Sequence, residues 1–283
     1  MRPREHGAPL DAWASPAQPR LLNPFRAIAS FIGNVIVIGE LEARKLRHDP
    51  TELLLRGAQP LIWLLVFGQV FTQLRAIPTG EMRYIDFMAP GILAQSVLFI
   101  SIFHGIAIIW ERDLGILHKF LVSPAPRAAL VLGKALSSVV RASVQAVIIY
   151  TVALLLGVQI NLNPLAILGV IVTVMLGATF FSTFSLIVAC LVKSRERFMG
   201  IGQVMTMPLF FASNAIYPIE IMPAWLQVIA RVNPLSYEVD ALRSLMLANG
   251  TSTFGLATDF AFLIVVGTFA VWIGAKLYPK VVV

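Results

Sequence analysis

Charged residues are scarce in this chain, and their scarcity decides the class of protein. Of the 283 residues, 13% are charged and 58% are hydrophobic, whereas soluble domains carry about 25% charged and about 45–50% apolar residues. So few charges do not cover the surface of a soluble globule of this size. The composition therefore excludes a soluble enzyme, a disordered chain and a disulfide scaffold, and it indicates a membrane protein with several spans.

Residues that carry catalytic, metal or energy-coupling chemistry are also missing. The one cysteine, Cys190, forms no disulfide within the chain, and we expect it to be a packing residue. No histidine pair or carboxylate cluster has metal-binding spacing. Gly133-Lys134 lacks the upstream glycine and the following Ser/Thr of a phosphate-binding loop. No predicted span carries an acidic residue at its centre, as an ion-coupled carrier would. We therefore expect no cofactor in this chain.

Long apolar runs predict six transmembrane helices, since a span needs about 20 mostly apolar residues. The longest charge-free run, 142–192, is divided by Asn161, Asn163 and Pro164. The predicted spans cover about residues 57–74, 87–110, 139–158, 164–192, 198–217 and 259–278.

The distribution of Lys and Arg predicts the orientation. With the N-terminus inside, 18 of the 22 basic residues lie in the cytoplasmic pieces 1–56, 111–141, 193–197 and 276–280. We therefore expect both termini in the cytoplasm and the chain in the plasma (inner) membrane. Topology accounts for the basic charge, so no nucleic-acid partner is expected.

The N-terminal region has two predicted parts. Residues 1–26 are rich in Pro, Arg and Ala and predict a disordered cytoplasmic leader. The apolar stretch 27–39, followed by the charged stretch 40–47, predicts a helix that lies in the inner membrane surface.

Two cytoplasmic features lie between the second and third spans. In Glu111–Pro126, leucines recur at helical spacing, which predicts a short amphipathic helix that is either a surface anchor or a docking piece for a cytosolic partner. Arg127, Lys134 and Arg141 follow at intervals of seven and lie near one stripe of a helix. This stripe contacts either anionic lipid headgroups or a partner in another subunit.

The external segment Pro218–Leu247 is interrupted by prolines, so it is not one spanning helix. Pro223 and Pro234 stand where two short helices would begin. Asp240 and Arg243 are one turn apart in the second helix and can pair. Because broken backbone at membrane depth must be buried in protein or line a cavity, we expect a re-entrant helical pair that closes the outer end of a pathway. The expected apolar faces comprise Trp225, Leu226 and Ile229 in the first helix and Leu235, Val239, Leu242 and Met246 in the second.

The chain resembles the permease subunits of ABC-2 type transporters, and among them the daunorubicin/drug-resistance exporters. The segments that carry the resemblance are 59–71, 88–99, 111–124 and 222–243. It implies an ABC-2 transmembrane domain over 27–283, an all-α membrane fold with six transmembrane helices, an N-terminal interfacial helix, a cytoplasmic coupling helix and external re-entrant helices. It also implies cytosolic ABC ATPase subunits that bind ATP and Mg, a second permease subunit in a homo- or heterodimer, and contact with membrane lipids.

The resemblance assigns two groups of site residues. Those coupled to the ATPase would be Glu111, Arg112, Gly115, Leu117 and Pro124. Those of an external re-entrant gate would be Pro223, Trp225, Asn233, Pro234, Asp240 and Arg243.

The expected function is therefore the membrane-spanning permease of an ATP-driven ABC exporter, without an ATPase site of its own. Its substrate would be hydrophobic or amphipathic: drug-like, a lipid or a lipid-linked glycan. One alternative is a non-transporting scaffold that recruits cytosolic proteins. Another is an intramembrane lipid-modifying enzyme, which would need His104 and a polar partner within the bundle.

Overall fold

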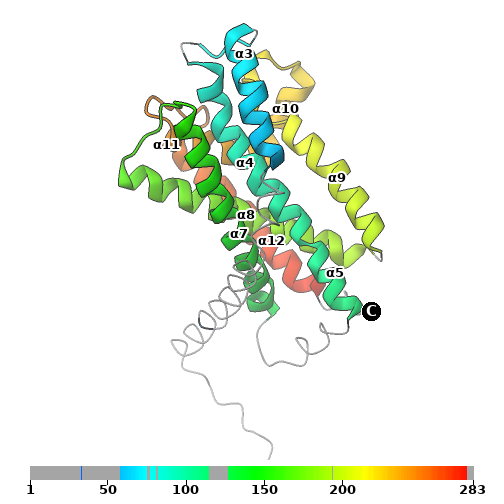
Figure 1. Ribbon diagram of the computed structural model, residues 1–283. Helices are drawn as coiled ribbons and strands as arrows, with labels where there is room; N and C mark the ends of the chain where they lie inside the picture. The colour runs from blue at the N-terminus through cyan, green and yellow to red at the C-terminus, as the bar shows by residue number, and fades with distance from the viewer. Residues whose placement is uncertain are drawn as a thin grey trace, which may run out of the picture.

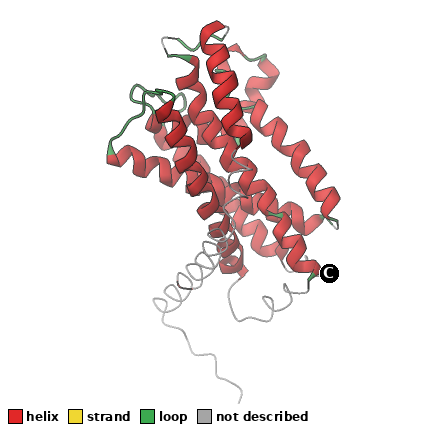
Figure 2. Ribbon diagram, viewed as in Figure 1, coloured by secondary structure: helices red, strands yellow, loops and turns green. Residues whose placement is uncertain are grey.

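The computed structural model describes residue 33 and residues 58–74, 77–80, 82–114, 127–192 and 194–278 (Figure 1). Within this part of the chain the secondary structure is helical, apart from one antiparallel bridge between Ile160 and Leu247 (Figure 2). This confirms the all-α class. The predicted leader 1–26 and, apart from residue 33, the predicted interfacial helix lie outside the described residues.

Four helical segments are long and apolar enough to cross a membrane. They are α4 with α5 (Tyr84–His104 and Ile106–Asp113), α7 (Arg127–Leu155), α8 (Pro164–Leu191) and α12 (Leu256–Leu277). Two shorter helices lie at two further predicted spans. One is Ala58–Leu74, which includes η2 (Trp63–Phe67) and α3 (Gly68–Leu74), and the other is α9 (Arg195–Phe211).

Helix α4 occupies the centre of the bundle, and 18 of its 21 residues are buried. Its own apolar residues lie on every side of the helix, as expected for a helix that is enclosed by other helices. It packs against α3, α7, α8 and α11 (Pro234–Met246). Gly105 separates α4 from α5, where the Ser185 hydroxyl donates a hydrogen bond to the carbonyl of Ile102. A side chain that bonds to the helical ladder is a recognised cause of such a break.

The ends of five helices gather at one end of the molecule, named here the α5 end. The first turns of α5, α7 and α9 and the ends of α8 and α12 share a hydrophobic cluster. The sequence predicts all of these turns on one side of the membrane. The cluster comprises Ile108, Ile109, Leu130, Val131, Leu186, Ala189, Val192, Phe198 and Tyr278.

The opposite end, named here the α10 end, contains the beginning of α4 and the loop from 156 to 163. It also contains η3 (Ile219–Ile221), α10 (Ala224–Val232) and the outer part of α11. Figure 1 shows α9 running from beside the end of α5 up to α10.

Helix α9 is shorter than the predicted span 198–217, because it ends at Phe211. Polar side chains just beyond its end take up carbonyls that further helical N–H groups would have bonded. The Ser213 hydroxyl donates to the carbonyl of Phe210 at 2.7 Å, and the Tyr217 hydroxyl donates to that of Phe211. The longer span was predicted from local apolar content, which gives no information about these hydrogen bonds.

The outward faces of the long helices are strongly apolar. Val147 of α7, Val204 of α9 and Val265 of α12 are each about two-thirds exposed. Extended apolar surfaces of this kind are typical of contact with lipid or another protein. They agree with the membrane location that the composition indicates.

Candidate functional site

An ion pair joins the last turn of α5 to the first turn of α9. Nε and Nη2 of Arg195 donate to Oδ2 of Asp113 at 3.0 and 2.8 Å. The Arg195 guanidinium also lies 3.5 Å from the ring centroid of Trp110. A bidentate contact combined with a cation–π contact fixes the guanidinium in one orientation. We refer to Trp110, Asp113 and Arg195 as the Asp113–Arg195 clamp.

The same turn of α5 also contacts α7 and the end of α8. Lys134 Nζ forms an ion pair with Glu111 Oε1, and Nη1 of Arg112 donates to the carbonyl of Val192 at 3.1 Å. Of the predicted stripe of Arg127, Lys134 and Arg141, Lys134 thus has a partner within this chain. Glu111 lies within reach only because α5 and α7 pack together, which spacing along one helix does not reveal.

The predicted coupling residues fall into two groups. Glu111 and Arg112 belong to the last turn of α5. This helix begins with apolar residues and ends at Asp113. Gly115, Leu117 and Pro124 lie outside the described residues. The predicted amphipathic helix from 111 to 126 is thus described only where it joins α5.

Two short helices begin at the prolines where the sequence predicts them. Pro223 is the N-cap of α10, and Pro234 is the first residue of α11, where the absent N–H would have no helical partner. Asn233, between the helices, accepts a hydrogen bond from the Leu235 N–H at 3.0 Å. Its Nδ2 donates to the carbonyls of Leu209 at 2.7 Å and Ala212 at 2.9 Å. Asn233 therefore caps the start of α11 and the end of α9 together, and we refer to these contacts as the Asn233 junction.

Asp240 and Arg243 do not pair with each other as the sequence predicts. In the described structure, Arg243 donates to the carbonyl of Asn214 at 2.7 Å and lies 3.9 Å from the ring centroid of Phe87. Asp240 Oδ2 accepts from the N–H groups of Thr253 and Phe254 at 2.7 and 2.9 Å. Both side chains are buried. Each satisfies backbone groups in a neighbouring loop, which would be costly to leave unpaired.

The two short helices differ in their exposure. The predicted apolar face of α11 is buried: Leu235, Val239, Leu242 and Met246 are each 0% exposed. Of the predicted face of α10, Trp225 is 67% exposed and Ile229 is exposed, whereas Leu226 is half-buried in a small hydrophobic cluster. Val228 and Val232 of α10 are exposed as well. Helix α10 thus presents an apolar stripe away from its own bundle.

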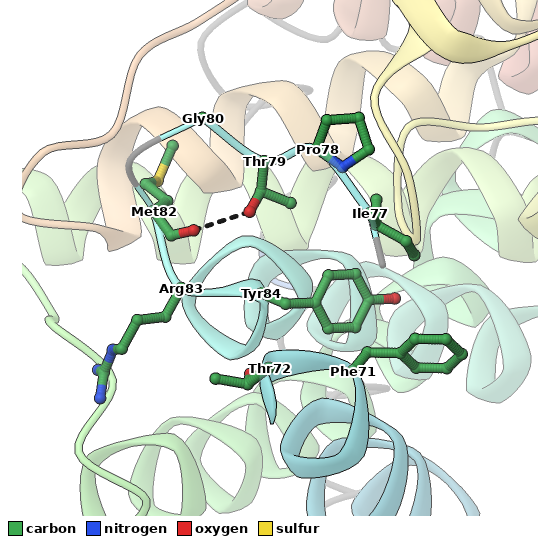
Figure 3. A pocket seen from close by; sticks show the side chains of 9 residues that line it. All are labelled: Phe71, Thr72, Ile77, Pro78, Thr79, Gly80, Met82, Arg83 and Tyr84. Atoms are coloured by element: carbon green, nitrogen blue, oxygen red, sulfur yellow. Dashed lines mark hydrogen bonds between the residues drawn. The ribbon is translucent and has the colours of Figure 1, made fainter. Parts of the chain in front are cut away.

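A cavity of about 660 Å³ lies at the α10 end, between α3 and the beginning of α4. Figure 3 shows the Thr79 hydroxyl bonded to the carbonyl of Met82 on its rim, with Phe71 and Tyr84 below it. Nε and Nη2 of Arg83 donate to Asp86, both at 2.8 Å, and the Arg83 guanidinium also reaches the carbonyl of Gly157. The hydrogen bond to Asp86 raises the pKa of Arg83. These contacts attach the loop after α7 to the first turn of α4.

Sequence reasoning missed Trp110, Asp113 and Arg195, as well as Arg83 and Asp86. Asp113 and Arg195 are separated by 82 positions, so no helical periodicity connects them. Their only local signal is a charge beside the end of an apolar run. His104, which an intramembrane enzyme would require, lies at the end of α4 and is half-buried.

Comparison with known proteins gives consistent results. The family model described as ABC-2 type transporter matches residues 34–247. The transport permease ycf38 of Cyanophora paradoxa is 31% identical over 221 residues, which cover 76% of this chain and 74% of that protein. The daunorubicin resistance ABC transporter permease DrrB1 of Streptomyces coeruleorubidus is 29% identical over 208 residues, covering 74% and 72%.

The multidrug ABC transporter permease YbhR of Escherichia coli is 27% identical over 176 residues, which cover 60% of this chain and 46% of that protein. The family match extends across α4 to α11, so it includes both the Asp113–Arg195 clamp and the Asn233 junction. Together with the long apolar helices, these findings show that the chain is a multi-pass membrane protein and belongs to the ABC-2 type transporter family.

Proposed function

We propose that this chain is the permease subunit of an ATP-driven exporter that moves a hydrophobic or amphipathic substrate out of the cytoplasm. Separate cytosolic ABC ATPase subunits bind ATP and Mg, and they dock on the segment that begins at Glu111 and ends at Pro124. Two permease subunits enclose the pathway. The names of DrrB1 and YbhR, which concern daunorubicin resistance and multidrug transport, support a drug-like substrate.

In this proposal six helices cross the plasma membrane, with both termini in the cytoplasm and the α5 end facing the ATPase. Five helix ends, all predicted at the inner side of the membrane, meet in one hydrophobic cluster, which supports this arrangement. Arg112, Lys134, Arg195 and Lys276 are at or near this end, in keeping with the excess of basic residues on cytoplasmic sides.

Helices α10 and α11 form a re-entrant pair that enters the membrane from its outer side. The packing of α11 along α8 supports this placement: Leu245 lies over Gly169 and Glu238 over Gly177. Gly177 is 13 residues from the first residue of α8, which corresponds to about 20 Å of helix. A bilayer core is about 30 Å thick. Helix α11 therefore begins well inside the bundle, and α10 turns its apolar stripe toward lipid or the second subunit.

The observation that carries the proposal is that α9 is fixed at both ends to the elements that an exporter must connect. At its first turn, the Asp113–Arg195 clamp joins it to α5 and thus to the docking segment. At its last turn, the Asn233 junction joins it to the re-entrant pair. Closure of the ATPase subunits pushes α5, the clamp moves α9, and α9 moves the outer pair.

Reconstitution tests this proposal directly. The chain is co-expressed with candidate ABC ATPase subunits from the same genome, purified as a complex and placed in vesicles. We expect stable association, and we expect the permease to change the rate of ATP hydrolysis. Replacement of Gly115 and Leu117 by bulky charged residues should abolish that change. An ATPase that does not associate, or a rate unaffected by these replacements, would contradict the coupling role and favour a non-transporting scaffold.

A further inference from the structure

One apolar segment that is long enough to cross a membrane is divided into two helices. The segment is Tyr84–Asp113, and Gly105 separates its two parts, α4 and α5. Hydrogen bonds across the break span three residues instead of the four of an α-helix. The Gly105 N–H donates to the carbonyl of Ile102 at 3.2 Å, and the Ile108 N–H donates to that of Gly105 at 3.1 Å. A tightened turn in the middle of a helix often marks a hinge.

Two neighbouring helices meet at this break. The Ser185 hydroxyl of α8 donates to the Ile102 carbonyl. A Cβ at Gly105 would overlap both that hydroxyl and the tip of the Phe198 ring of α9. The backbone of Gly105 has φ −60° and ψ −22°, which any residue adopts. Glycine is therefore needed here for space and not for its conformation, because it lets the serine reach the carbonyl and lets α9 touch the break.

The two sides of the break pack in different hydrophobic clusters. Ile102, just before Gly105, belongs to the large cluster that contains most of α4. Ile108 and Ile109, just after it, belong to the cluster at the α5 end. In α4, 18 of 21 residues are buried, whereas in α5 two of eight are buried. Helix α4 is thus fixed in the bundle, and α5 has few buried contacts to lose if it tilts.

The last turn of α5 is positioned mainly by polar side-chain contacts. These are the Asp113–Arg195 clamp, the ion pair of Glu111 with Lys134, and the bond from Arg112 to the carbonyl of Val192. Helix α5 has eight residues, so it is about 12 Å long. A change of about 20° in its direction, the lower limit of a sharp helix kink, would move its last turn by about 4 Å. Such a shift exchanges polar contacts and leaves the main core packed.

We infer that Gly105 is a pivot at which α5 tilts on a fixed α4, and that Ser185 maintains the pivot by bonding the Ile102 carbonyl. The tilt carries the first turn of α9 with it, because the clamp binds that turn to the end of α5. The use of this motion in coupling rests on the proposed function, since α5 leads into the docking segment. The pivot itself is a property of the permease chain alone.

The test measures distances in the full-length chain in lipid nanodiscs, without ATPase and without nucleotide. Spin labels are attached to Leu114→Cys, just after α5, and to Val265→Cys of α12, both at exposed positions, in a Cys190→Ala background. Pulsed electron paramagnetic resonance gives the distribution of distances between the labels. The parent should populate more than one position of α5, so its distribution should be about 4 Å wider than that of a chain with a continuous helix.

A continuous helix is made by the paired replacement Gly105→Ala with Ser185→Ala. Loss of the serine hydroxyl frees the Ile102 carbonyl and makes room for the new methyl group, so the pair should fold where Gly105→Ala alone overpacks. Alanine also favours a helix over glycine. The pair should narrow the distribution to one distance, and Ser185→Ala alone should narrow it in part. If the pair does not fold, the result for Ser185→Ala decides.

Two controls separate a pivot from general loosening. Ser182→Ala removes a buried hydroxyl that bonds within α8, to the carbonyl of Thr179, and should leave the parent distribution unchanged. Labels at Val147→Cys of α7 and Val265→Cys, both exposed and away from the break, should give one narrow distance in every variant.

A parent distribution as narrow as that of the paired variant would overturn the inference, and so would equal effects of Ser182→Ala and Ser185→Ala. Because no ATPase is present, either result leaves the docking and transport proposal standing. An ATPase that does not associate with the permease leaves the pivot standing.

Discussion

The two ends of α9 are held by different kinds of bond. At the α5 end, Arg195 meets Asp113 where both side chains are about one-third exposed. At the α10 end, Asn233 is 4% exposed and donates to two backbone carbonyls. An exposed ion pair contributes little to stability because water and salt screen it. Buried polar bonds are costly to break because the groups left behind have no water to replace them.

This difference indicates how motion could pass through the helix. The Asp113–Arg195 clamp can separate and re-form at low cost, so it suits a joint that works against a moving partner. The Asn233 junction holds the end of α9 and the start of α11 as one unit. We therefore expect variants at the α10 end to act mainly on stability and variants at the clamp to act mainly on coupling.

The largest loss of stability is expected at Asn233. Asn233→Asp keeps the oxygen that caps α11 but removes both Nδ2 donors, leaving the carbonyls of Leu209 and Ala212 without them. Two unpaired buried carbonyls should lower the free energy of unfolding by about 3 kcal/mol or more. Thermal unfolding of the purified chain in nanodiscs measures this. An Asn233→Asp variant as stable as the parent would show that the junction is not a rigid unit.

A second loss is expected where α4 packs against the segment after α9. A Cβ at Gly91 would overlap the backbone carbonyl of Ala215, which cannot move aside as a side chain can. Gly91→Ala should therefore cost about 1–3 kcal/mol through overpacking. Gly200→Ala on α9, where no atom lies within 4 Å, is the control and should unfold at the parent temperature or slightly above it, because alanine favours a helix over glycine. Equal behaviour of the two variants would contradict close packing at the α10 end.

The smallest effect on stability is expected at the clamp. Asp113→Asn and Arg195→Gln remove an exposed pair and should hardly change the melting temperature. They should nevertheless reduce the effect of the permease on ATP hydrolysis in the reconstituted complex. Glu196→Gln, beside Arg195 but exposed, should leave hydrolysis unchanged. A clamp variant that unfolds early but couples normally would reverse the comparison between the two ends.

The sequence predicts most of the helices because they depend on local features. Apolar runs locate the long helices, Asn163-Pro164 marks the start of α8, and Pro223 and Pro234 mark the short ones. The end of α9 at Phe211 was not predictable, because the bonds that end it come partly from Asn233, more than 20 residues away.

The site is predictable only in part, because its contacts join distant segments. The sequence singles out Asn233 and Arg243 in the external segment, but their partners at Leu209, Ala212 and Asn214 follow from tertiary packing. The spacing of Asp240 and Arg243 along α11 predicts an ion pair between them. In the structure each side chain instead bonds to backbone groups of a nearby loop, which would otherwise be buried without a partner.

The most direct test asks whether the clamp transmits nucleotide-driven motion to the α10 end. Glu220 of η3, an exposed polar residue at the α10 end, is replaced by Cys in a Cys190→Ala background, and the reconstituted complex is labelled with a membrane-impermeant maleimide. Trapping the ATPase with ATP and vanadate should change the labelling rate in the parent. That change should vanish in Asp113→Asn with Arg195→Gln, and it should return in the exchanged pair Asp113→Arg with Arg195→Asp. A nucleotide-dependent change of equal size with and without the clamp would contradict the proposal that α9 connects the two ends.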